Sequence, residues 1–268
     1  MENQAKQPNK FSVIIPTFQR QEKLSKAISS VVKQTYCEKN SDCVEIIVVA
    51  DGCTDGTHDY VPKLTKTYKN LIYIHKHREQ RLIARNVGMR AARFPWICWM
   101  DDDDEMYPEY LSTFSKMIDE NPAEDVFQCA VRFGKDIDGV FKEFSILKPK
   151  ELEHIDFEDN EDTFQHDTKL KKTREHFTSG CITTGQFIFR KGCLETVGYL
   201  PHTNKYGDFA IDSGIPGYGW RPPEGRFKEK RVQVLGNPWG DDFYLFYKLT
   251  RYFNVKNTQS ILFKKNCR

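Results

Sequence analysis

The sequence predicts an α/β fold with a doubly wound, mostly parallel sheet. Within the first 120 residues, short apolar runs alternate with longer stretches that carry apolar residues at helical spacing. The short runs lack a regular polar alternation, as expected for strands that are buried on both faces. Apolar residues make up 39% of the 268 residues, which is enough for one packed core. This order of buried strands and helices is typical of a parallel sheet covered on both faces.

Local patterns define each element of this half. Short apolar runs predict strands at residues 11–16, 44–50, 71–75 and 95–100. Helical spacing of apolar residues, or a proline at the first helical position, predicts helices at residues 20–35, 57–68, 82–93 and 108–120. The second strand ends in a turn from Asp51 to Gly56, where Asp and Gly stand at positions that suit tight turns.

Beyond Asp125 the regular alternation ends. Two antiparallel strands at 126–133 and 140–147 are predicted around a turn at Asp136–Gly139. The charged stretch 148–176 is expected to be a loop or loosely ordered helices, and residues 199–240 a long irregular segment. The remaining predicted elements are a strand at 186–190, a short helix to Val197, a helix at 242–252 and a strand at 260–263.

Composition and charge narrow the function and the compartment. A formal net charge of +2 gives no reason to expect a nucleic-acid partner. The eight cysteines form no CxxC pair, so we expect a reduced, cytoplasmic protein. The polar N-terminus has no signal-peptide core, and no apolar run approaches the roughly 20 residues of a membrane span. We therefore expect no integral membrane segment, while contact with a membrane surface stays open.

The most informative feature is the acidic run Asp101–Asp104, which directly follows the apolar residues 95–100. Four carboxylates cannot stay unpaired in a core, because the cost of removing them from water is too high. A hard divalent cation with oxygen ligands, Mg²⁺ or Mn²⁺, would relieve their repulsion and commonly shares a substrate phosphate. The alternative is a solvated acidic turn at the start of a helix, where Asp is also favoured.

Polar groups follow three of the predicted parallel strands. Pro16–Phe18 end the first strand, Asp51 the second and Asp101–Asp104 the fourth. Ligands of open parallel sheets bind beyond the carboxyl ends of the strands, so these groups predict a nucleotide site. The glycine-rich phosphate loops of NAD-binding and P-loop proteins are missing from the sequence. A metal ion, rather than backbone amides, is therefore expected to balance the charge of a diphosphate.

Four motifs together resemble the family 2 glycosyltransferases of the GT-A fold. They are FSVIIPTFQR, VEIIVVADGCTDGT, ARNVGMRAA and WMDDDDEMYPEYL, which match in order and spacing across residues 11–112. The resemblance returns at residues 187–200 and 239–249. It implies a Rossmann-like sheet with a smaller antiparallel acceptor-side part. We expect a single domain over residues 1–268, with a nucleotide-binding half at about 11–120 and an acceptor-binding half at about 121–268.

The resemblance implies roles for the matching residues. The nucleotide sugar would be bound by Pro16, Thr17, Phe18, Arg20, Asp51, Arg81, Asp101 and Asp102. Within this set, Pro16, Phe18 and Asp51 would hold the base, and Arg81 would reach the nucleotide or its diphosphate. Asp101 and Asp103 would be the two acids of the D-x-D motif, with Asp103 on the metal and Asp101 nearer the ribose. Asp102, where the family normally has a small residue, leaves the metal register open between Asp101/Asp103 and Asp102/Asp104.

On the acceptor side, Asp241 and Asp242 stand where the family usually has a Glu-Asp pair. The resemblance implies that Asp242 is the catalytic base and Asp241 its neighbour. The alternative is that Asp242 only caps the helix that follows it. A second departure is Ala50, which replaces the first of two acids that usually end the second strand.

The resemblance implies an inverting glycosyltransferase. It would move a sugar from a nucleotide sugar, most simply UDP-linked, to a hydroxyl of a carbohydrate, lipid-linked or other acceptor, with Mn²⁺ or Mg²⁺. One alternative is a metal-dependent nucleotidyltransferase, although Thr17–Arg20 stand where such enzymes carry a basic, Gly-rich loop. The other is a non-catalytic module that binds nucleotide sugars or carbohydrates. The sugar, the acceptor, the linkage position and the oligomeric state do not follow from the sequence.

Overall fold

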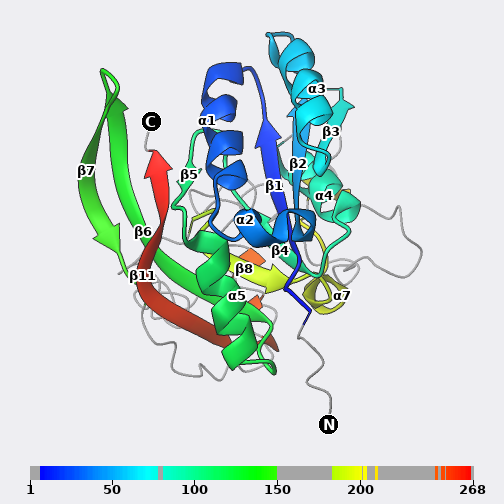
Figure 1. Cartoon of the computed structure of the whole chain (residues 1–268). Coiled ribbons are helices and arrows are strands. Elements are labelled where there is room, and N and C mark those ends of the chain that lie inside the picture. The colour runs from blue at the N-terminus through cyan, green and yellow to red at the C-terminus, as the bar shows by residue number, and fades with distance from the viewer. Residues whose placement is uncertain are drawn as a thin grey trace.

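A nine-stranded sheet runs through the described part of the molecule, and helices pack against it (Figure 1). The computed structural model describes residues 7–77, 81–149, 183–200, 202–203, 209–210, 245–246, 249–250 and 252–266. In that part of the chain, no helix combines the length and the apolar character that crossing a bilayer requires.

Most of the longer elements lie close to the predicted positions, and the short elements at residues 37–43, 105–106, 202–203 and 209–210 were not predicted. The strands of the large sheet are β1 (Phe11–Thr17), β2 (Val44–Asp51), β3 (Leu71–Lys76), β4 (Trp96–Trp99), β5 (Glu105–Met106), β6 (Val126–Ile137), β7 (Val140–Leu147), β8 (Phe187–Arg190) and β11 (Val255–Asn266). A separate pair is formed by β9 (His202–Thr203) and β10 (Phe209–Ala210). The helices are α1 (Gln21–Val32), α2 (Cys37–Asn40), α3 (Thr57–Thr67), α4 (Arg81–Ala91), α5 (Tyr110–Glu120) and α7 (Cys193–Val197), with a 3-10 turn at Ser41–Cys43.

The strand order explains where a site can form. The order is β3-β2-β1-β4-β8-β6-β11-β5, with β7 paired to the outer part of β6. β1 to β4 are mutually parallel where they pair, and β8 runs antiparallel to both β4 and β6. From β1 the chain extends the sheet to β3 on one side and then places β4 on the other side. The gap beyond the carboxyl ends of β1 and β4 is therefore the topological switch point. The expected mixed, mostly parallel α/β fold is confirmed.

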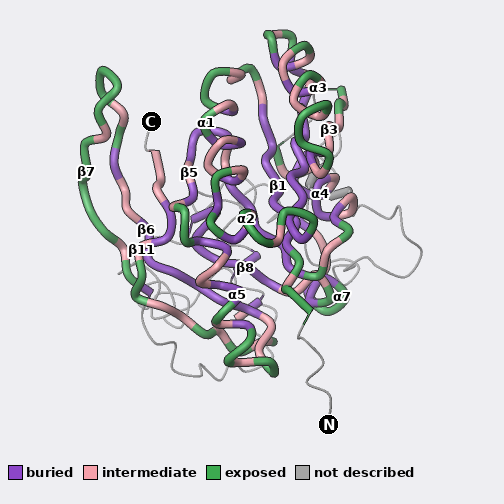
Figure 2. Tube along the Cα trace, viewed as in Figure 1, coloured by how far each residue is buried: buried purple, intermediate pink, exposed green. Residues whose placement is uncertain are grey.

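Two apolar cores cover the two faces of the sheet. Phe11, Val13 and Ile15 of β1 pack in one core with α1 and α5, whereas Ile14 packs in the other with α4 and α7. Successive side chains of a strand point to opposite faces, so a strand between two helical layers must be apolar throughout. Figure 2 shows β1 and its neighbours as an almost continuously buried centre. This explains why their sequences show apolar runs instead of alternation.

Close packing fixes the position of α4 on the sheet. A Cβ atom at Gly88 would lie 2.3 Å from Cγ2 of Ile14, so only glycine allows this approach of helix to strand. The same helix presents Arg85 to the end of β4, as described below. Gly88 in the ARNVGMRAA motif therefore allows α4 to pack closely on β1.

The last strand was only partly predicted. A strand was expected at 260–263, but β11 spans twelve residues and pairs in parallel with β6. Its sequence VKNTQSILFKKN is mostly polar, so only the short apolar stretch could be recognised. Leu245, Phe246 and Leu249 of the expected 242–252 helix are buried and helical. Residues 150–182, most of 199–240, and the acids Asp241 and Asp242 lie outside the described residues.

Candidate functional site

The ends of β1 and β4 are joined by side chains. Thr17, the last residue of β1, donates a hydrogen bond from its hydroxyl to Oδ2 of Asp102 at 2.8 Å. Arg20 contacts Oδ1 of Asp102 at 2.8 Å and Oδ2 of Asp103 at 3.1 Å. Because these strands flank the switch point, residues 85 positions apart in the sequence form one polar cluster.

The loop after β1 is also fixed to the loop after β2. Gln19 has a positive φ of 54°, and its side-chain oxygen accepts hydrogen bonds from the backbone N–H groups of Thr54 and Asp55. The Asp55 carboxylate in turn accepts from the N–H of Gln21 at 3.1 Å. These bonds hold the start of α1 against the turn that follows β2. They place Arg20 and the half-buried Phe18 at the same edge of the sheet as Asp51.

Asp51 ends β2 and is largely buried, with 7% of its surface exposed. Its Oδ1 lies 2.7 Å from the ammonium of Lys76, which ends the neighbouring strand β3. The parallel register sets these two residues side by side. Asp51 therefore stands at the predicted strand end, but its carboxylate is partly engaged by the protein.

On the other side of the acidic run, Lys265 bridges two of the acids. Its ammonium lies 2.7 Å from Oδ2 of Asp101, 2.8 Å from Oδ2 of Asp104 and 3.3 Å from the Thr184 hydroxyl. Asp104 also accepts a hydrogen bond from the N–H of Asn266 at 2.9 Å. Since Lys265 and Asn266 both belong to β11, the carboxyl end of that strand is attached directly to the acidic run.

Two arginines of α4 add positive charge near Asp101. Arg85 is fully buried, and its guanidinium lies 2.7 Å from Oδ1 of Asp101 and over the ring of Trp99. Arg81 opens the helix, is exposed, and contributes its charge to the surroundings of Asp101. Asn86 binds the backbone of Leu200 through both ends of its amide. Arg85 and Asn86 thus hold α4 against its neighbours.

The acids differ in their electrostatic surroundings. Burial raises the pKa of Asp104 to about 8, despite the opposing charge of Lys265. Burial also acts on Asp101, but Lys265 and Arg85 outweigh it and hold the pKa of Asp101 well below its usual range. The pKa of Asp102 is raised, because burial outweighs Arg20 and Thr17. Of these three acids, Asp101 is therefore the one most firmly held as a carboxylate.

Three of the four acids suit a hard divalent cation. Asp101, Asp103 and Asp104 each offer a carboxylate oxygen, and these oxygens lie within 4.8 Å of one another. Oxygen donors of this kind are what Mg²⁺ and Mn²⁺ prefer. Asp102 is directed instead at Thr17 and Arg20. The geometry brings together the Asp101/Asp103 pair rather than the Asp102/Asp104 pair, and it adds Asp104.

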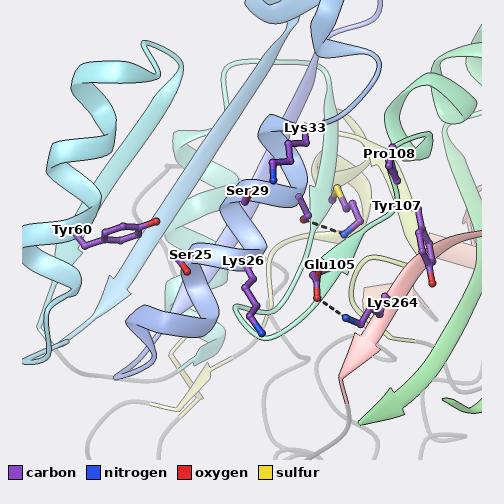
Figure 3. A pocket seen from close by; sticks show the side chains of 11 residues that line it. Ser25, Lys26, Ser29, Lys33, Tyr60, Glu105, Tyr107, Pro108 and Lys264 are labelled. Carbon is purple, nitrogen blue, oxygen red and sulfur yellow. Dashed lines mark hydrogen bonds and ion pairs between the residues drawn. The ribbon is translucent and has the colours of Figure 1, made fainter. Parts of the chain in front are cut away.

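A cavity of about 610 Å³ lies elsewhere, between α1 and the segment Glu105–Pro108 (Figure 3). Figure 3 shows Lys26, Lys33 and Lys264 among its lining side chains, with Lys264 directed at Glu105. None of the described residues that line this cavity is among the predicted nucleotide-binding or metal-binding residues. The cavity is therefore separate from the cluster of predicted residues at the strand ends.

Most predicted residues lie at one edge of the sheet, and two of the lysines that contact them were not predicted. Pro16, Thr17, Phe18, Arg20, Asp51, Arg81 and Asp101–Asp103 all lie at or just beyond the ends of β1, β2 and β4 or at the start of α4. The predicted base Asp242 and its neighbour Asp241 lie outside the described residues. Neither Lys265 nor Lys76 is marked by a motif in the sequence. Lys76 could have been found by placing the predicted ends of the second and third strands side by side.

Comparison with known proteins identifies the family of this chain. The model of the family described as "Glycosyl transferase family 2" matches residues 12–197, which is most of the chain. The chain belongs to glycosyl transferase family 2. A curated relative is the GalNAc(5)-diNAcBac-PP-undecaprenol beta-1,3-glucosyltransferase of Campylobacter jejuni, 30% identical over 150 residues. That match covers 55% of this chain and 47% of the relative. The chain spans less than half the length of the curated relatives it matches.

Solved structures support the fold. Staphylococcus aureus TarS 1–349 in complex with UDP has a TM-score of 0.59 at 18% identity, covering 96% of this chain and 60% of that protein. The mannosyltransferase PcManGT of Pyrobaculum calidifontis, in complex with GDP-Man and Mn²⁺, has a TM-score of 0.55 at 14% identity. It covers 97% of this chain and 59% of that protein. At these identities the likeness concerns the fold alone, and it agrees with the family 2 fold expected from the motifs.

Proposed function

We propose that this chain is an inverting, metal-dependent glycosyltransferase that moves a sugar from a UDP-linked nucleotide sugar to an acceptor hydroxyl. One observation carries the proposal: in a member of glycosyl transferase family 2, the acidic run meets the end of β1 at the switch point. That position is where nucleotides bind to sheets of this class. The UDP complex of TarS supports a uridine donor.

The donor side follows from the strand ends. Asp51 would accept hydrogen bonds from the base, and Pro16, Thr17 and Phe18 would form the wall beside it. Arg20 and Arg81 would place positive charge near the diphosphate. Asp102 would act mainly by holding Arg20 and Thr17, since its carboxylate already contacts both. A donor bound in this way would lie across the ends of β1, β2 and β4.

Asp101 and Asp103 would hold the metal, with Asp104 near enough to join them. When bound, a divalent cation supplies positive charge that stabilises the leaving nucleoside diphosphate. The close carboxylate oxygens support this assignment, and the Mn²⁺ complex of PcManGT agrees with it. Arg85 would keep Asp101 ionised and oriented through its 2.7 Å contact.

The reaction needs one base and no covalent intermediate. Asp242 would take the proton from the acceptor hydroxyl while that oxygen forms a bond to the anomeric carbon of the sugar. The bond from this carbon to the diphosphate oxygen breaks on the opposite face, which inverts the configuration. Asp241 would orient its neighbour. The role of Asp242 rests on its family position after the D-x-D motif.

The acceptor is proposed only as a class. A curated relative is named for a substrate linked to undecaprenyl diphosphate. A carbohydrate hydroxyl, free or lipid-linked, is therefore the acceptor class that we favour. Contact of the protein with a membrane surface would fit a lipid-linked acceptor.

The test is a donor screen with the purified chain. Release of nucleoside diphosphate is measured with UDP-linked and GDP-linked sugars, with Mn²⁺, with Mg²⁺ and with a chelator. We expect release from a UDP-sugar that requires metal and rises with an acceptor. The Asp103→Asn variant is the matched control, since it removes one proposed ligand and keeps the side-chain size.

Other outcomes would point to the alternatives. Formation of pyrophosphate from UTP and a sugar phosphate would indicate a nucleotidyltransferase. Tight binding of a nucleotide sugar with no release under any metal condition would indicate a binding module. Release that is equally fast in chelator would contradict metal dependence while leaving sugar transfer intact.

A further inference from the structure

Lys265 holds the same carboxylates that are proposed to hold the metal. Its ammonium contacts Oδ2 of Asp101 and Oδ2 of Asp104 at 2.7 and 2.8 Å. Both acids belong to the group of three whose oxygens converge within 4.8 Å. The lysine side chain is only 17% exposed, so this is a partly buried ion pair rather than a surface contact.

The acidic run is already surrounded by positive charge. Its four carboxylates face at least four cationic side chains, namely Arg20, Lys23, Arg85 and Lys265. A divalent cation added to this cluster would stand a few ångströms from the Lys265 ammonium. Charges of the same sign repel strongly at that distance in a partly buried site. The metal and the ammonium therefore compete for Asp101 and Asp104.

The chemistry of lysine suits a displaceable cation. A lysine ammonium is a compact charge on a flexible four-carbon stem, whereas an arginine fork binds a carboxylate in a fixed, two-pronged geometry. Arg85, on the other oxygen of Asp101, is fully buried and fixed between Trp99 and the acid. Lys265 is more exposed and lies one residue before the end of β11. Of the two cations on Asp101, Lys265 is the one that can move away.

We propose that Lys265 is a built-in competitor that sets the metal affinity of the acidic cluster, and that metal binding displaces its ammonium from Asp101 and Asp104. This inference rests on the proposed metal site. Without metal, Lys265 keeps the buried acids paired and fastens β11 to the end of β4. With metal bound, the divalent ion would pair with the buried acids in place of Lys265.

The test compares the metal affinity of Lys265→Met with that of the wild type. Binding of Mn²⁺ alone, without nucleotide, is followed by electron paramagnetic resonance and calorimetry. Methionine keeps the length of the side chain and removes its charge. We expect Mn²⁺ to bind about tenfold tighter or more, because the repelling charge is gone. Lys265→Arg keeps the charge and should bind Mn²⁺ no tighter than the wild type.

The neighbouring lysine provides a matched control. Lys264 lies on the same strand, but its ammonium contacts Glu105 at 2.6 Å, beside the cavity in Figure 3. Lys264→Met removes the same charge without touching Asp101 or Asp104. It should change the Mn²⁺ affinity by less than about twofold, because Lys264 contacts Glu105 and does not compete for the three converging acids.

Thermal unfolding gives a second readout. We expect Lys265→Met to be less stable than the wild type without metal, and to gain more stability from a given Mn²⁺ concentration, since tighter binding stabilises more. If methionine prevents folding, Lys265→Gln replaces it, because glutamine keeps a hydrogen-bond donor at this position.

Three results would contradict the proposal in different ways. Equal or weaker Mn²⁺ binding by folded Lys265→Met or Lys265→Gln would overturn the role of Lys265 alone. A gain in Lys264→Met as large as that in Lys265→Met would also overturn it, because general charge would then explain the effect. If the wild type binds no Mn²⁺ with or without UDP, the metal site of the proposed function fails as well.

Discussion

The two sides of the acidic cluster are built from very different parts of the chain. On the side that is proposed to bind the donor, called the donor side below, β1 pairs with β2 through seven consecutive residues without a shift in register. On the far side, β6 pairs with β11 across more than 120 residues of sequence, and this pairing has two register shifts. The first side is continuous and apolar, whereas β11 is a mostly polar strand with a short buried centre.

This difference separates two kinds of task. On the donor side, the loops that follow β1 and β2 have fixed positions, because each strand is buried between two helical layers. The β11 side supplies one cation and one backbone N–H to the acids. The first task requires a rigid local scaffold. The second requires only that the distant strand β11 ends beside the acidic run.

The largest effect on turnover is expected from a substitution in the acidic run itself. Asp103→Asn should lower turnover by about 10³-fold or more, since a bound metal supplies several kcal/mol of charge stabilisation in the transition state. Calorimetry should show that Mn²⁺-dependent binding of UDP is weakened as well, while the fold stays intact.

Asp102→Asn is the contrasting variant. Its side chain can still accept a hydrogen bond from Thr17, and only the charge opposite Arg20 is lost. We therefore expect a smaller loss than in Asp103→Asn. A larger loss at Asp102 would mean that the metal uses the Asp102/Asp104 pair.

The second prediction concerns the acceptor side. Asp242→Asn removes the ability to accept a proton and keeps the ability to cap a helix, because Asn caps about as well as Asp. Turnover should fall about 10²–10⁴-fold, the usual contribution of a general base. Donor binding and thermal stability should change little. Asp241→Asn should cost less, and near-normal turnover in Asp242→Asn would assign the base to another residue.

The two sides of the acidic cluster also differ in how well the sequence predicts them. Asp51 and Asp101–Asp104 are visible in the sequence because each follows an apolar strand directly. Their ends meet because neighbouring parallel strands end at one edge of a sheet. Lys265 has no such signal. It contacts an acid 164 residues earlier, and its strand is interrupted by polar residues. The pairing of β11 with β6 joins residues far apart in the chain, so the local sequence pattern does not predict it.

The third prediction tests whether Asp51 binds the nucleotide or only pairs with Lys76. Asp51→Ala should weaken UDP binding by roughly 1–3 kcal/mol, because buried donors of the base would lose their partner. Lys76→Met breaks the same 2.7 Å ion pair and keeps the carboxylate. We expect it to weaken UDP binding much less, as measured by calorimetry. Equal losses in both variants would show that the ion pair, rather than direct contact, is what matters.

The smallest effect is expected from a packing variant on the donor side, which should change stability but not UDP binding. Gly88→Ala adds a Cβ that would lie 2.3 Å from Cγ2 of Ile14, a branched buried side chain that cannot swing away. Overpacking of this kind costs about 1–3 kcal/mol, and the better helix propensity of alanine returns part of it, so we expect a net loss of about 1–2 kcal/mol. The melting temperature should fall by a few degrees.

The control for this variant is Gly192→Ala, where an added Cβ would meet no atom within 4 Å. Its stability should stay within about 0.5 kcal/mol of the wild type. Folded Gly88→Ala should still bind UDP with nearly the wild-type affinity, because Gly88 lies in the core of the sheet–helix contact and touches no proposed ligand. Weakened UDP binding together with unchanged stability would instead mean that the glycine serves the ligand, and that the donor side is less rigid than its continuous register indicates.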